Sequence, residues 1–257
     1  MSTAPMRARK RGTRLAAGWL SLALAGFAHG QAADEPPPVG LPAHSMLEDP
    51  FNRSLLLDEL ETFERDGRRE LAWDATFWAG YAFDKLLVRT EGEKRGGTTE
   101  DAELELLWSH SVARWWDVEA GARADFEPGA TESWAAFGIR GLAPYRFELE
   151  ATAYLGDGGK SAARLEAEYE LLVTPRLILQ PQIEIDWYGQ SDASRGSGAG
   201  LSTVEAALRL RYEIRREIAP YVGLVRERRF GASAELARAD GQDADDTRFV
   251  AGVRLRF

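Results

Sequence analysis

The chain has 257 residues, a formal net charge of −9 and no cysteine. The absence of cysteine excludes disulfides, thiolate catalysis and thiolate metal sites. The acidic balance argues against a nucleic-acid partner, because phosphate binding needs a field of Lys and Arg. The mean hydropathy of −0.35 is too polar for a bundle of membrane helices. It remains compatible with a membrane β-barrel, in which every second residue can face water.

Residues 1–30 have the pattern of an export signal. Five basic residues between Arg7 and Arg14 precede an apolar run of 13 residues from Leu15 to Phe27, and small residues follow. A spanning helix needs about 20 apolar residues, so we expect a cleaved signal peptide, with an uncleaved anchor as the alternative. Removing its five basic residues would change the net charge from −9 to −14.

Residues 31–53 are predicted to form an extended, disordered tether. Five prolines lie between Asp34 and Asn52, and proline disfavours both helices and β-ladders. The segment contains His44 and Met46, which are separated by one residue and could both contact one metal ion.

Residues 54–257 are predicted to form an all-β domain, because apolar and polar residues alternate there with period two. In residues 247–257, Phe249, Ala251, Val253, Leu255 and Phe257 share one face, opposite three arginines. We expect about twelve antiparallel strands and no helix, with most strands near the roughly 9–11 residues that cross a bilayer obliquely. The predicted strands are residues 54–64, 71–83, 86–93, 102–112, 116–126, 133–141, 146–156, 161–172, 177–188, 201–214, 220–230 and 247–257. In the first of these, the weakest pattern, Leu56 and Leu60 are expected to face outward.

The connections between these strands alternate between short and long. Tight turns are expected at residues 84–85, 113–115, 142–145, 173–176 and 215–219, and longer polar loops at 93–101, 127–132, 157–160, 189–200 and 231–246. This asymmetry is typical of outer-membrane barrels, and an even strand count places both termini at the short-turn, periplasmic end.

The alternative to a transmembrane barrel is a soluble β-sandwich or a lipocalin-like barrel, which would bury the apolar faces. Three observations favour the membrane: the polar faces hold many carboxylates, small residues such as Ala120 could not fill so large an interior, and aromatic residues cluster at strand ends as interface girdles do. These aromatic residues are Trp108, Trp115, Trp116, Trp187, Tyr188, Phe230 and Phe257.

Several stretches resemble the copper-resistance protein B family of Gram-negative outer membranes, from about Trp73 to the end. They are residues 89–93 (RTEGE), 141–148 (GLAPYRFE), 164–170 (RLEAEYE), 176–181 (RLILQP), 208–223 (LRLRYEIRREIAPYVG), 227–231 (ERRFG) and 247–257 (TRFVAGVRLRF). The resemblance implies an outer-membrane barrel that binds copper or lets it cross, with outer-membrane lipid and periplasmic copper-handling proteins as partners. Such proteins often carry a Met- and His-rich stretch before the barrel. Here it is reduced to His44 and Met46, so a plain polar linker is the alternative to a metal site.

Inward-facing charges are the main chemical feature of the predicted barrel. Carboxylates on neighbouring strands are expected at similar depth, with arginines in the periplasmic half of other strands. The two groups are Glu148, Glu150, Glu168, Glu170, Glu184 and Asp186, and Arg209, Arg211, Arg254 and Arg256. They form either a salt-bridged brace that holds strand register or an acidic path that favours cations. A passive porin without metal preference is the alternative function.

Three further motifs carry weaker signals. His110 is expected on the lipid face, whereas Ser109 and Ser111 point to the opposite face, so we expect no catalytic pair and no enzyme. Residues 156–160 (GDGGK) lack the spacing and helix of a phosphate-binding loop and are read as a hairpin turn. Residues 240–246 (DGQDADD) lack the closing Glu of an EF-hand and are read as an acidic loop with weak divalent-cation binding as an option.

Overall fold

The computed structural model describes residues 49–257 except 66, 96–97 and 127–130. The predicted signal peptide, most of the tether, and both His44 and Met46 lie outside the described residues. Within the described part, no helix is both long enough and apolar enough to cross a membrane.

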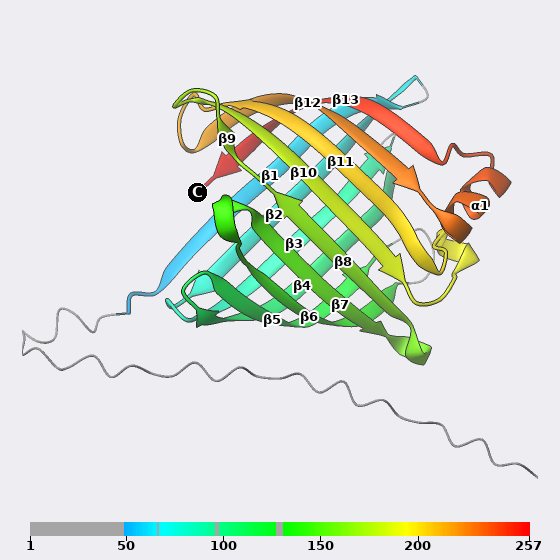
Figure 1. Cartoon of the computed structure of the whole chain (residues 1–257), viewed down its shortest axis with the longest axis horizontal. Coiled ribbons are helices and arrows are strands. Elements are labelled where there is room, and N and C mark those ends of the chain that lie inside the picture. Colours follow the sequence, from blue (N-terminus) through cyan, green and yellow to red (C-terminus); the bar gives the residue numbers. More distant parts are fainter. Residues whose placement is uncertain (1–48, 66, 96–97, 127–130) are drawn as a thin grey trace, which may run out of the picture. The chain divides into compact units, whose positions relative to one another are not determined.

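The described chain folds into one antiparallel sheet that closes on itself as a barrel of twelve staves, which confirms the predicted fold (Figure 1). Two of the thirteen strand segments, β8 and β9, share one stave because both pair with β10. The barrel closes where β10 pairs with β11 and β1 with β13. The strands are β1 (Asn52–Arg65), β2 (Arg68–Gly80), β3 (Asp84–Arg95), β4 (Thr98–Ala113), β5 (Trp116–Asp125), β6 (Glu132–Leu142), β7 (Glu148–Gly156), β8 (Ser161–Glu168), β9 (Leu171–Leu172), β10 (Leu177–Tyr188), β11 (Gly200–Tyr212), β12 (Ile218–Arg229) and β13 (Asp245–Arg256).

The first and last strands form the seam of the barrel. Leu57 pairs with Leu255, and Leu55 and Phe257 exchange two backbone hydrogen bonds of 2.9 and 2.8 Å. The start of β1 and the C-terminus therefore lie at one end of the barrel, and helix α1 (Gly231–Ala239) lies at the other (Figure 1). We call these the short-turn end and the loop end.

The outer wall is apolar, as the period-two alternation predicts. Phe249 is 82% exposed, whereas its neighbour Val250 points inward and is only 3% exposed. Trp108 and Phe257 are exposed near strand ends, consistent with the expected aromatic girdle. Tyr188, which we expected in the same girdle, is an exception because it points inward and lines two cavities.

The interior is partly filled by large apolar side chains, which lie between the charged residues of the inner wall. One apolar cluster gathers on the inner wall of β3 to β7, and a second where β11, β12 and β13 meet β1. The clusters are Leu87, Leu107, Trp134, Ala136 and Tyr154, and Phe63, Ala207, Tyr221, Val225 and Val250. Bulky aromatic and aliphatic residues, not small residues such as Ala120, therefore fill part of the interior.

Three local predictions are corrected by the structure. Pairing shifts between Leu57 and Glu59, so that Asp58 and Glu59 both turn inward and Leu56 faces inward with its neighbour Thr76. Such a bulge adds one residue to one strand and reverses the alternation beyond it. The predicted 93–101 loop is mostly strand, because β3 ends at Arg95 and β4 begins at Thr98. The predicted 231–246 loop contains α1, so the barrel is not free of helix.

Candidate functional site

Two rows of carboxylates run around the inner wall, each in register from strand to strand. The first row, which we call ladder A, crosses β1 to β6, and the second, ladder B, crosses β7 to β13. Within each ladder every carboxylate is the direct cross-strand neighbour of the next. Ladder A is Glu59, Asp74, Glu91, Glu103, Asp125 and Glu132. Ladder B is Glu150, Glu166, Glu184, Glu205, Glu227 and Asp246. Each stave of the barrel therefore contributes one acid.

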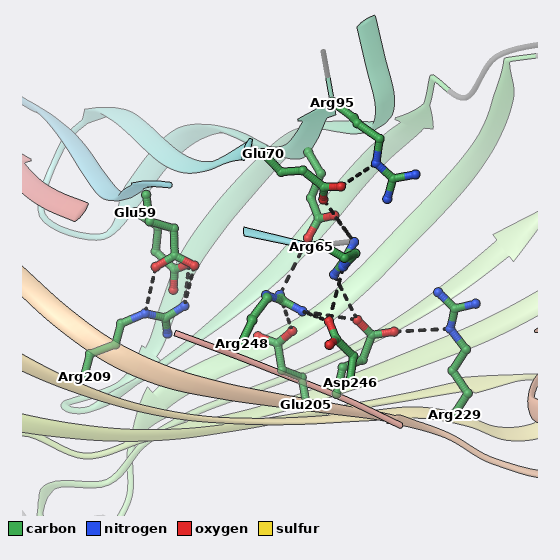
Figure 2. A network of polar contacts seen from close by, with 12 residues as sticks. Glu59, Arg65, Glu70, Arg95, Glu205, Arg209, Arg229, Asp246 and Arg248 are labelled. Carbon is green, nitrogen blue, oxygen red and sulfur yellow. Dashed lines mark hydrogen bonds and ion pairs between the residues drawn. The ribbon is translucent and has the colours of Figure 1, made fainter. Parts of the chain in front are cut away.

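Like charges on directly opposite residues are destabilising, and arginines from other strands offset most of this repulsion. Arg209 lies 2.7 Å from Glu59, and Arg248 lies 3.1 Å from Glu205 and 3.7 Å from Asp246. Figure 2 shows the Arg209 guanidinium turned toward Glu59 and that of Arg248 turned toward Glu205 and Asp246. Charge-assisted contacts of this kind offset the repulsion within each ladder, as a salt-bridged brace would.

Two ladder members lack such an arginine. Asp74 and Glu166 make no ion pair among the described residues, and Glu166 only accepts a 2.9 Å hydrogen bond from the amide of Gln182. Both line a cavity of about 230 Å³ at the short-turn end. Glu148 and Glu168, which face each other across β7 and β8, line the same cavity without an ion pair. Ten carboxylates and five arginines line this cavity, so its wall is strongly acidic.

The structure brings together six of the ten lumen residues predicted from the sequence. Glu148, Glu150, Glu168, Glu170, Arg254 and Arg256 all line the short-turn cavity. Glu170 accepts hydrogen bonds from Arg211 at 2.5 Å and from Arg254 at 3.0 Å. Glu184 and Asp186 line a second cavity of about 300 Å³. Arg209 lies apart from the short-turn cavity, in contact with Glu59 and Glu61.

Other residues of the site were missed by sequence reasoning. Asp74, Glu91 and Glu103 belong to ladder A, and Arg164 contacts both ladders. Their inward orientation follows from period two, but their mutual contacts depend on strand stagger. The signal available in the sequence was an acidic residue on the inward face of every strand, which indicates a row of carboxylates around the lumen.

The loop end holds a third cavity, of about 440 Å³, beneath α1 and the 189–199 loop. The Ser233 hydroxyl in α1 accepts a hydrogen bond from the Gly198 amide at 2.8 Å and contacts the Ser202 hydroxyl at 2.7 Å. Outside the strands, Lys160 lies 2.6 Å from Asp192. Hydrogen bonds from Lys160 and Ser194 lower the pKa of Asp192 to about 2, and the same contact raises the pKa of Lys160.

No preformed metal centre and no Ser–His pair is present in the described part of the chain. No group of three or more His, Cys, Asp or Glu residues there is arranged to hold a metal ion. His110 lies on the outer face, where its Nδ1 is 2.9 Å from Asp84 and its ring stacks on Trp108. Ser109 is buried in the interior, and the Ser111 hydroxyl donates to Asp117 at 2.6 Å.

The closed antiparallel barrel with charged residues on its inner wall defines the fold class of porin-like β-barrels. Two solved structures share this fold. The NanC porin aligns with a TM-score of 0.55 at 14% identity, covering 77% of this chain and 98% of the porin. The KdgM porin aligns with a TM-score of 0.50 at 12% identity, covering 79% and 99%. At such identities the likeness concerns the fold alone.

Sequence comparison identifies the family. Residues 51–257 match the family described as Copper resistance protein B precursor. The chain is 49% identical over 214 residues to the Copper resistance protein B homolog of Pseudomonas syringae pv. tomato (strain ATCC BAA-871 / DC3000), covering 83% of this chain and 73% of that protein. It is 44% identical over 217 residues to Copper resistance protein B of Escherichia coli, covering 84% and 73%. The chain belongs to the copper-resistance protein B family, as its sequence blocks predicted, and this membership supports a role in copper resistance.

Proposed function

We propose that the protein resides in the outer membrane of a Gram-negative bacterium, exported by its N-terminal signal, and that its lumen binds copper ions or lets them cross. Family membership supports the link to copper, and the acidic short-turn cavity is the observation that supports the path. Copper is the cargo in this proposal, and the barrel contributes to copper homeostasis without catalysing a reaction.

The ladders suit transient cation binding better than permanent storage. Adjacent strands lie about 4.7–4.9 Å apart, so successive ladder carboxylates offer a cation closely spaced oxygen sites. Conduction requires sites that attract the ion without holding it, and the arginines that share these carboxylates weaken each site. Four carboxylates that form no ion pair within the described residues mark the part of the path with the strongest attraction for cations: Asp74, Glu148, Glu166 and Glu168.

A direct test replaces Glu148, Glu150, Glu168 and Glu170 by glutamine together. We expect the variant barrel to lose cation preference in planar-bilayer recordings and to admit less copper into proteoliposomes. Glu213 and Glu217, in the turn between β11 and β12, provide the matched control when replaced by glutamine. If the reversal potentials in a salt gradient match those of the wild type, these carboxylates do not form a cation path. They then serve only as a structural brace.

Copper specificity separates this function from that of a passive porin. Deletion of the gene should sensitise cells to copper and leave tolerance to zinc and nickel unchanged. Equal sensitisation to all three metals would favour a barrel without metal preference.

We further propose that His44 and Met46 on the tether capture copper before it enters the lumen, and that periplasmic copper-handling proteins exchange copper at the short-turn end. An imidazole and a thioether are ligands that copper accepts. Copper bound to the refolded protein, measured with and without residues 31–53, tests the tether. Equal copper content in the two forms would make the segment a plain linker.

A further inference from the structure

Arg164 occupies an unusual place in the lumen. Among the described residues, only Glu103 and Arg164 line all three cavities, the short-turn cavity and the two nearer the loop end. The side chain of Arg164 is 18% exposed. It therefore stands at the junction of the cavities and is not part of one wall alone.

The ion pairs of Arg164 reach across the barrel. Its Nη1 atom lies 2.6 Å from Glu91 on β3 and 3.3 Å from Glu103 on β4. Its Nε atom lies 3.3 Å from Glu184 and 3.0 Å from Asp186, both on the adjacent β10. Strand β8 is five places from β3 in the ring of twelve staves, one place short of diametrically opposite. One guanidinium thus joins nearly opposite walls.

These contacts also join the two carboxylate ladders. Glu91 and Glu103 belong to ladder A and Glu184 belongs to ladder B, so the guanidinium neutralises the point at which the ladders meet across the lumen. A planar guanidinium with five donors can serve several carboxylates at once. A mobile cation that moves from one cavity to the next meets the same carboxylates. These are already paired with the positively charged guanidinium of Arg164.

We propose that Arg164 closes the lumen between the short-turn cavity and the loop-end cavities, as a tethered cation that a passing cation must displace from Glu91, Glu103 and Glu184. The inference rests on the proposed cation path and adds the residue that regulates it. Carboxylates attract cations into both cavities, and the guanidinium limits passage between them.

The experiment records single-channel conductance of the refolded full chain in planar bilayers with potassium chloride and no copper. We expect Arg164→Ala and Arg164→Gln to raise potassium conductance about threefold or more and to increase cation preference, because the lumen loses both its bridge and a positive charge. Arg140→Gln is the matched control. Arg140 also lines the short-turn cavity, but its ion pair, at 3.7 Å, is with Glu150 on the neighbouring strand.

The double variant Arg164→Gln, Glu91→Gln keeps the net charge of the wild type. It leaves fewer carboxylates unpaired than Arg164→Gln alone, which guards against a failure to fold. It should also conduct more than the wild type. Conductance unchanged in the double variant, or raised equally by Arg140→Gln, would overturn the proposal. Because potassium is the probe, this result is independent of copper: the copper proposal can fail while Arg164 still limits the lumen, and the reverse also holds.

Discussion

The buried contact between Arg209 and Glu61 allows a quantitative prediction for the change Arg209→Met. Arg209 is 3% exposed and Glu61 is 2% exposed. The guanidinium lies 2.7 Å from Glu59, 3.3 Å from Glu61 and 2.6 Å from the amide oxygen of Gln182. After the change, the hydroxyl of Tyr221, at 3.0 Å, would be the donor left to the Glu61 carboxylate.

Removing one partner of a buried ion pair costs about 3–5 kcal/mol. Both Glu59 and Glu61 lose this guanidinium. We therefore expect Arg209→Met to lower the free energy of unfolding by about 3–5 kcal/mol at pH 7.

The assay is urea unfolding of the barrel in phospholipid vesicles, followed by the fluorescence of the seven tryptophans between Trp73 and Trp187. Arg226→Met is the control, since Arg226 pairs with Asp245 at 2.8 Å on the exposed surface, where a salt bridge contributes little to stability. The double change Arg209→Met, Glu61→Gln should recover part of the loss. A loss below about 1 kcal/mol at pH 7 would refute the reasoning about a stranded charge.

Three further predictions concern the outer wall, the loop end and the titration of a loop. Leu106→Arg places a charge on an outward position that is 52% exposed, and should lower stability in vesicles by about 2–4 kcal/mol if that position lies near the bilayer midplane; unchanged unfolding midpoints would contradict a lipid-facing outer wall. Gly198→Ala puts a Cβ 2.1 Å from the Ser233 nitrogen, so α1 should shift and its amides should exchange faster with deuterium, whereas unaltered exchange would show that the close contact is not required. The pKa of Asp192 is lowered to about 2, so its stabilising contact is fully present above the ordinary value of 3.8 and is lost as the pH falls through about 2. A carboxyl NMR titration should show that midpoint and an upward shift in Lys160→Met, and a midpoint near 3.8 in the wild type would count against the contact.

The strands were predictable because alternation is a local property of the sequence. Residues 177–188 were predicted as a strand and match β10 at both ends. The bulge near Leu57 was not predictable, because Leu56 and Leu60 fit an unbroken alternation equally well. Helix α1 carried a local signal that polar loop composition concealed, since residues 232–239 (ASAELARA) are rich in strong helix formers.

The candidate site was predictable only in part, because its chemistry depends on stagger between strands. Period two placed Glu150 and Glu166 on the inner face, but their direct pairing follows from register, which turn geometry and closure of the ring determine together. The reach of Arg164 to Glu91 joins residues 73 positions apart in the chain. Neither alternation nor spacing contains that information, so the point at which Arg164 joins the two ladders required the three-dimensional structure.

The seam between β1 and β13 sets the order of events in assembly. Leu57 and Leu255 stand at nearly opposite ends of the described sequence, and contacts of such long sequence separation form slowly. Until β13 docks on β1, two strand edges expose amide and carbonyl groups that hydrocarbon cannot solvate. Insertion of the strands and closure of the ring must therefore be coupled. A chain that lacks its last strand would have unpaired strand edges and would not form a stable structure in a bilayer.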